Sequence, residues 1–170
     1  YLALFVLPAD ATQQEIYRIL FVHVPAAIFS ELIYIFMACC GFIYLVWKTK
    51  ISAIMLRSAI SLGLVFTLIV LISGAIWGKP TWGTYWVWDA RITSTFILLI
   101  QYIGLLALRT SFNTMQTTDQ ILSIVAIVGA INIPIIKFSV NWWNTLHQNA
   151  SITFSGSSID AEMLYVLPLM

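Results

Sequence analysis

Four long apolar runs dominate the sequence and limit what it can fold into. They cover residues 22–47, 58–77, 92–108 and 120–136. A helix needs about 17–25 predominantly apolar residues to cross the hydrocarbon core of a bilayer. Backbone polar groups find no water there, so helices and closed barrels are the structures that span it. The sequence therefore predicts an all-α, multi-pass membrane bundle that forms a single domain over residues 1–170.

Composition supports the bilayer as the surrounding medium. Hydrophobic residues make up 61% of the chain and charged residues only 9%, whereas a soluble domain has about 25% charged residues. The net charge of +1 excludes a polybasic nucleic-acid binder. Two further apolar runs, at residues 1–8 and 161–170, are too short to span. They predict a six-helix protein whose first and last helices are cut.

A few polar residues interrupt the predicted spans. Glu31 lies about two turns inside the first span, and an ionisable group in a membrane segment is a functional candidate by default. Its nearness to the interface also allows a purely structural explanation, because the carboxylate can reach water or headgroups. Asn132 and Pro134 predict a kink. Gln101 predicts a hydrogen bond between helices.

Charge in the connecting segments predicts the orientation. The two short linkers, residues 48–57 and 109–119, are dense in basic residues, which favours the cytoplasmic side. The longer segments 9–21, 78–91 and 137–162 hold the same number of basic residues but also most of the acidic ones. We therefore expect two external loops, residues 78–91 and 137–162, on the periplasmic side or its equivalent in an organelle.

Tryptophan is concentrated on this external side. An aromatic belt would place indoles at both membrane interfaces, so a one-sided distribution predicts a ligand that needs aromatic rings. Gly78, Pro80 and Gly83 are expected to break helical geometry and let the loop 78–91 fold along the membrane surface. Six of the seven tryptophans lie on this side: Trp77, Trp82, Trp86, Trp88, Trp142 and Trp143.

Both histidines of the chain, His23 and His147, lie on the same side. Each alone could be an ordinary polar residue at the interface, but together with the indoles they favour ligation. Haem fits, because its iron takes axial imidazoles, its ring stacks on aromatic faces and its propionates need cations. The candidate haem-binding residues are His23, His147, Trp82, Tyr85, Trp86, Trp88, Lys79, Asp89, Arg91, Trp142 and Trp143.

The expected roles differ among these residues. His23 and His147 would ligate the iron, and the tryptophans of the loop would pack on the macrocycle. Lys79 and Arg91 would pair with the propionates. Asp89 would orient the loop through Arg91 or backbone amides and would not touch the iron.

Residues 77–94, WGKPTWGTYWVWDARITS, closely resemble the tryptophan-rich signature of the haem-handling proteins of cytochrome c maturation. The segments HVPAA, beginning at His23, and NWWNTLHQ, which contains His147, look like the flanking histidine segments of the CcmC branch. The resemblance implies six helices, haem b as the ligand, and His23 and His147 as its two axial ligands. Tyr85 stands where this family usually has the first tryptophan of a pair.

The resemblance also implies partners and a location. It implies that haem passes to the chaperone CcmE, which becomes covalently linked to it, within a complex that contains the ATPase CcmA and the membrane proteins CcmB and CcmD. The expected location is a bacterial or mitochondrial inner membrane, with the haem site on the periplasmic side. No GxxxxGK[ST] phosphate loop occurs in the chain, so ATP hydrolysis would belong to a partner.

Three other functions remain open from the sequence. A transporter that moves haem through the bilayer would need polar groups along the spans, and there are few. A haem lyase that acts on apocytochrome directly would be a larger protein with more histidines. A purely structural membrane subunit would not need clustered external tryptophans. No independent catalytic motif is evident, and the protein would at most assist covalent attachment of haem to the chaperone.

Overall fold

The computed structural model describes residues 13–143, 145–147, 152–153 and 156–157. Within them the chain is almost entirely helical, with one minimal antiparallel strand pair that aligns Ile152 with Ser157. The elements are the 3-10 helix η2 (Glu15–Ile19), α1 (Leu20–Trp47), α2 (Lys50–Trp82), α3 (Ala90–Leu108), α4 (Met115–Gly129), α5 (Asn132–Trp142), β1 (Ile152–Thr153) and β2 (Gly156–Ser157).

Four helical segments of the described chain are long and apolar enough to cross a membrane. They are η2 with α1, α2, α3, and α4 with α5. The predicted all-α bundle is therefore confirmed, with four segments that have the length and apolar composition of membrane spans. The expected six-helix total stays a prediction, because residues 1–8 and 161–170 lie outside the described part of the chain.

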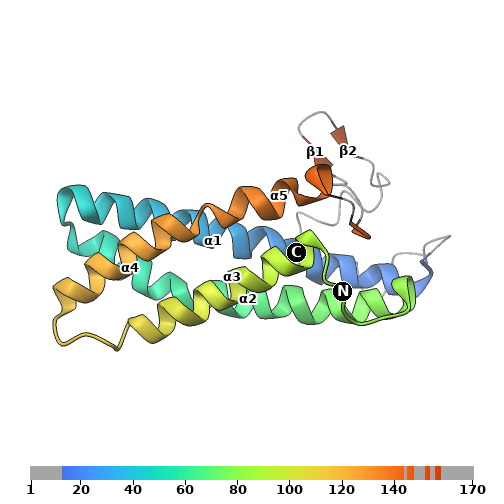
Figure 1. Ribbon diagram of the computed structural model, residues 1–170, viewed down its shortest axis with the longest axis horizontal. Coiled ribbons are helices and arrows are strands. Elements are labelled where there is room, and N and C mark those ends of the chain that lie inside the picture. The colour runs from blue at the N-terminus through green and yellow to red at the C-terminus, as the bar shows by residue number, and fades with distance from the viewer. Residues whose placement is uncertain (1–12, 144, 148–151, 154–155, 158–170) are drawn as a thin grey trace.

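The helices run alternately up and down and form one elongated bundle (Figure 1). Helix α1 packs against α2 and α4, and α3 packs against α2 and α5. As a result the start of α1, the end of α2, the start of α3 and the end of α5 lie at one end of the bundle (Figure 1). The buried core includes Tyr34, Met37, Ile60, Leu98, Tyr102 and Leu122.

Helix α2 is longer at both ends than the apolar run predicts. It begins at Lys50, so the connection between the first two spans is a short turn at Lys48 and Thr49 and not a linker over 48–57. It continues through Trp82, so the expected break at Gly78 and Pro80 was wrong. Pro80 lacks the N–H that would bond to the carbonyl one turn before it, but it lies in the last turn of α2, so little of the helix follows it. The segment between α2 and α3, which was expected to be an external loop over 78–91, is thus reduced to residues 83–89.

Gly83 ends α2 in the left-handed conformation. Its φ is +80°, and its N–H bonds to the carbonyl of Lys79 at 3.0 Å. Glycine suits this position because a side chain is strained at positive φ. The second expected external loop, residues 137–162, is also partly helical, because α5 continues to Trp142.

The fourth span is interrupted between α4 and α5, as Asn132 and Pro134 predict. Pro134 lies in the first turn of α5. Backbone N–H groups in a first turn have no acceptor within the helix, so the missing N–H of proline costs no helical hydrogen bond there. The amide of Asn132 donates to the carbonyl of Ser94 on α3 at 2.9 Å. The amide of Gln101 donates to the carbonyl of Gly129 at 3.3 Å, which confirms the predicted bond between helices.

Candidate functional site

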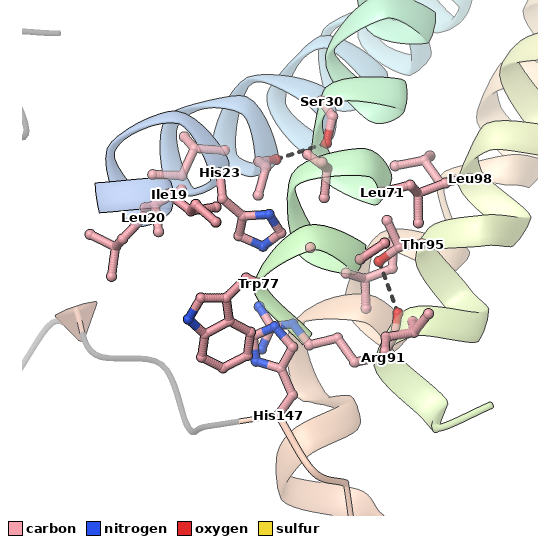
Figure 2. Close-up of a pocket in the computed structure, with 18 of the residues that line it drawn as sticks. Ile19, Leu20, His23, Ser30, Leu71, Trp77, Arg91, Thr95, Leu98 and His147 are labelled. Carbon is pink, nitrogen blue, oxygen red and sulfur yellow. Dashed lines mark hydrogen bonds between the residues drawn. The ribbon is translucent and has the colours of Figure 1, made fainter. Parts of the chain in front are cut away.

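A cavity opens at the tryptophan-rich end of the bundle, between α1, α2, α3 and α5. Figure 2 shows His23, Trp77, Arg91 and His147 gathered around it. Its lining residues are Gln13, Ile19, Leu20, His23, Val24, Ala27, Ile28, Ser30, Glu31, Val70, Leu71, Gly74, Ala75, Trp77, Trp82, Tyr85, Trp86, Arg91, Ile92, Thr95, Leu98, Ile136, Lys137 and His147. We call this space the end cavity.

His23 enters the end cavity from the first turn of α1, two residues before Pro25. Its Nδ1 lies 2.9 Å from the hydroxyl oxygen of Ser73 on α2. That hydroxyl lies 2.6 Å from the carbonyl oxygen of Ile69 and 3.2 Å from that of Val70. The imidazole of His23 is thereby attached to the neighbouring helix through the hydroxyl of Ser73, and the backbone carbonyl of Val70 also accepts a hydrogen bond from the ring.

His147 lies against two indoles of α2. Its ring centroid is 6.3 Å from that of Trp77 and 6.1 Å from that of Trp82. The two indoles contact each other edge to face, with centroids 5.0 Å apart, an arrangement that aromatic rings favour. The pair therefore forms an apolar wall on which the second imidazole rests.

The two imidazoles come close together although their residues are far apart in the sequence. Their ring centroids are 6.4 Å apart and their planes make an angle of 27°. Two imidazoles that ligate one metal ion from opposite sides have centroids roughly 6 Å apart, because each metal–nitrogen bond is about 2 Å long. The spacing is thus compatible with one iron held between His23 and His147.

Charged side chains line one side of the end cavity. Arg91 comes from the first turn of α3, Lys137 from α5 and Glu31 from α1. Asp89 caps α3, since its carboxylate accepts a hydrogen bond from the backbone N–H of Ile92 at 2.8 Å. Asp89 is buried, at 9% exposure, and it fixes the start of the helix that carries Arg91.

Six of the sequence-predicted residues line the end cavity, and five do not. Lys79 donates instead to the carbonyl of Gly83 at 3.1 Å, with its Nζ 5.2 Å from the centroid of the Tyr85 ring. Trp88 is 71% exposed and contacts Trp86. Those that line the cavity are His23, Trp82, Tyr85, Trp86, Arg91 and His147, and those that do not are Lys79, Trp88, Asp89, Trp142 and Trp143.

Sequence reasoning missed Trp77 and Lys137 as lining residues. The indole N–H of Trp77 donates to the side-chain oxygen of Gln13 at 3.1 Å, so the residue also ties α2 to the segment before α1. The signal for Trp77 was its place at the start of the tryptophan-rich segment 77–94. The signal for Lys137 was weaker, since the residue falls at the predicted edge of the fourth span.

The residues of the end cavity fit a flat macrocycle that carries carboxylates. The imidazoles supply metal ligands, the indoles supply a stacking surface and the two cations can pair with carboxylates. In addition, the indole nitrogen of Trp86 is buried and has no hydrogen-bond partner among the described residues. A buried donor of this kind favours a bound acceptor, because leaving it unpaired costs free energy.

Known proteins resemble the chain over nearly its whole length. The family "Heme exporter protein C" (CcmC) matches residues 1–170. Heme exporter protein C of Escherichia coli K12 is 47% identical over 156 residues, which are 92% of this chain and 63% of that protein. The putative cytochrome c biosynthesis ccmC-like mitochondrial protein of Marchantia polymorpha is 49% identical over 164 residues, 96% of this chain and 69% of that protein.

A more distant relative agrees with these two. Heme exporter protein C of Bradyrhizobium diazoefficiens is 42% identical over 164 residues, 96% of this chain and 62% of that protein. The chain thus spans about two thirds of the length of the relatives it matches. On the full-length family match and these identities, the chain belongs to the heme exporter protein C (CcmC) family.

Proposed function

We propose that this protein binds haem in the end cavity, through His23 and His147, and delivers it to the chaperone CcmE at the periplasmic face of the membrane. The 6.4 Å separation of the two imidazole rings is the observation on which the proposal rests. Haem handling agrees with the name of the bacterial relative, heme exporter protein C, and the mitochondrial relative is named for cytochrome c biosynthesis.

Each part of the end cavity has a task in this proposal. The two imidazoles approach the iron from opposite sides, and Trp77 and Trp82 support His147 from behind. Occupation of both axial positions leaves no open site for oxygen on the iron. Arg91 and Lys137 neutralise the propionates. The cargo is haem b, which is bound without a covalent link to the porphyrin. It can therefore leave when the imidazole–iron bonds and the contacts with the lining residues are broken.

Delivery requires that a partner reach the site from outside the bundle. Tyr85 and Trp88 are 61% and 71% exposed and lie on the short segment between α2 and α3. Exposed aromatic residues beside a ligand site are suited to contact with another protein. CcmE would approach here, and covalent attachment of haem would take place on the chaperone. CcmA, CcmB and CcmD are the expected further members of the complex.

The position of the end cavity favours presentation over passage through the bilayer. Among the described residues its lining comes from the tryptophan-rich half of the bundle and ends at Glu31, Val70 and Leu98. The opposite half, where α1 turns into α2, contributes none of the lining residues. A route for haem across the membrane would need polar or open space along that half as well.

Haem spectra of histidine variants test the proposal. The protein is purified with haem, and visible and electron paramagnetic resonance spectra are recorded for the wild type, His23→Ala and His147→Ala. We expect a low-spin spectrum in the wild type and loss of bis-imidazole ligation in each variant, with recovery when imidazole is added. Trp143→Phe, at an exposed position outside the end cavity, serves as the control. Unchanged low-spin ligation in both histidine variants would refute the assignment.

A further inference from the structure

Ser73 stands beside the proposed ligand His23 and has no assigned role. We infer that Ser73 is a positioning residue that selects the tautomer of His23 and so leaves Nε2 as the unprotonated nitrogen offered to iron. The identity of the bound metal rests on the proposed function above. The tautomer itself is a property of the protein alone and can be tested without haem.

The hydrogen bonds around Ser73 determine where the protons lie. Its hydroxyl oxygen is 2.6 Å from the carbonyl oxygen of Ile69 and 3.2 Å from that of Val70. A carbonyl oxygen can only accept, so the single hydroxyl proton of Ser73 is donated within α2. The hydroxyl oxygen then has only lone pairs left for His23, whose Nδ1 lies 2.9 Å away. Nδ1 must therefore carry the imidazole proton.

The same arrangement specifies the reactive nitrogen. A neutral imidazole carries one proton, and a proton on Nδ1 leaves the lone pair of Nε2 available to a metal. Histidines that ligate metals usually donate their other N–H to an oxygen of the protein, which fixes both the tautomer and the orientation of the ring. Ser73 supplies that oxygen here, beside the backbone carbonyl of Val70, and both belong to a helix other than the one that carries His23.

Gly74 completes the arrangement by letting the ring lie close to α2. A Cβ atom at this position would lie 3.2 Å from Cε1 of His23 and 3.7 Å from its Nδ1. The first distance is tighter than an ordinary contact, so a side chain larger than hydrogen would press on the ring. Ser73 and Gly74 therefore set the rotation and the depth of His23 together.

Nitrogen NMR of histidine-labelled protein tests the tautomer directly. The whole chain is purified in detergent without haem, and the His23 signals are assigned with His23→Ala. We expect a protonated Nδ1 in the wild type and a shift towards the Nε2-protonated form in Ser73→Ala. Ser73→Thr keeps a hydroxyl and should retain the wild-type tautomer. An unchanged tautomer in Ser73→Ala would overturn the inference.

Thr67 provides a matched control on the same helix. Its hydroxyl also donates to a backbone carbonyl one turn earlier, that of Gly63 at 2.7 Å, and the residue is fully buried. It does not line the end cavity. Thr67→Val therefore removes a comparable hydrogen bond within α2, and the tautomer of His23 should stay as in the wild type. A shift as large as that of Ser73→Ala would show that any packing defect in α2 has this effect.

Haem titration separates this inference from the proposed function. Loss of an outer partner of a metal-ligating histidine lowers metal affinity about 10- to 100-fold, and we expect this loss in Ser73→Ala and not in Thr67→Val. If His23→Ala loses low-spin ligation but Ser73→Ala keeps the wild-type haem affinity, only the role of Ser73 in haem binding is refuted, and the proposed function stands. A tautomer that depends on Ser73, with unchanged ligation in His23→Ala, would refute the proposed function alone.

Discussion

Two tyrosines cross the middle of the bundle over glycines on neighbouring helices. A Cβ atom on Gly63 would lie 2.1 Å from Cζ of Tyr102. Tyr102 is fully buried, and its hydroxyl donates to the carbonyl of Ser30 at 2.8 Å. Gly129 gives the same kind of space to Tyr34, whose hydroxyl would lie 2.0 Å from an added Cβ. Close approach of helices at small residues is typical of membrane proteins.

Gly63→Ala should destabilise the protein, because the buried ring of Tyr102 has no free space into which it can withdraw. Overpacking of this kind costs about 1–3 kcal/mol. The measurement is thermal or denaturant unfolding in detergent. Gly104→Ala on α3 is the control, since a Cβ there meets nothing within 4 Å, and alanine is the better helix former. Equal destabilisation by the two substitutions would contradict this account of the glycines.

Residue types predicted part of the site. The other part depends on where α2 ends, which the sequence did not reveal. The sidedness of His23 and His147 was readable from the sequence, and the structure brings the two rings together. The role of Lys79 was not readable. Because α2 continues past Pro80, Lys79 donates to the carbonyl of Gly83 at the end of the helix and does not reach into the end cavity. For the same reason Trp82 lies beside His147 on a helix that was predicted to end at residue 77.

At the scale of elements, an ion pair joins α2 to α4 at the end of the bundle away from the tryptophans. Arg57 of α2 and Asp119 of α4 contact each other, with side chains 16% and 10% exposed. Both residues were predicted to lie in cytoplasmic linkers, yet both lie inside helices. Burial makes each charge dependent on the other, because an unpaired charge in a low-dielectric environment is costly.

Asp119→Ala should therefore destabilise the protein strongly, since it leaves Arg57 without its partner. Breaking a buried pair from one side costs about 3–5 kcal/mol, whereas replacement of both partners by apolar residues is often tolerated. We expect the double variant Arg57→Leu/Asp119→Leu to unfold at higher denaturant concentration than Asp119→Ala. A double variant no more stable than the single one would show that the charges do not depend on each other.

The existence of the four spans was predictable, but their ends were not. Hydropathy reports the part of a helix that lies in hydrocarbon, and it placed the second span at residues 58–77. The helix itself runs from Lys50 to Trp82. Its additional turns contain Lys50, Arg57, Lys79 and Pro80, which were predicted to lie in the segments between the spans. Hydrogen bonding continues through such residues when neighbouring helices and capping groups satisfy the backbone.

At the scale of the whole molecule, the two ends of the bundle differ in chemistry. One end holds the indoles and the end cavity, and the other holds the exposed basic residues Lys48, Lys50 and Arg109. Basic residues in short connections favour the cytoplasmic side of a membrane. The proposed orientation therefore places haem binding outside and the basic turns inside.

Thiol labelling of intact cells checks this orientation. In a background with Cys39 and Cys40 replaced by alanine, Trp88→Cys should react with a membrane-impermeant maleimide added from outside, because position 88 is exposed. Lys50→Cys, at the start of α2 and exposed as well, should react only after the inner membrane is permeabilised. The reverse pattern would mean that the end cavity faces the cytoplasm.

The break between α4 and α5 makes the spacing of the two imidazoles depend on an angle. His23 belongs to α1 and is attached to α2, whereas His147 follows α5, which packs against α3. The 11 residues of α5 form a lever about 16 Å long, so a rotation of about 5° at the break moves its far end by about 1.4 Å. That displacement is more than half the length of a metal–nitrogen bond, which is about 2 Å. In the proposed function, the angle between α4 and α5 would therefore help to set the distance between the two ligands of the iron, together with the contact of His147 with Trp77 and Trp82.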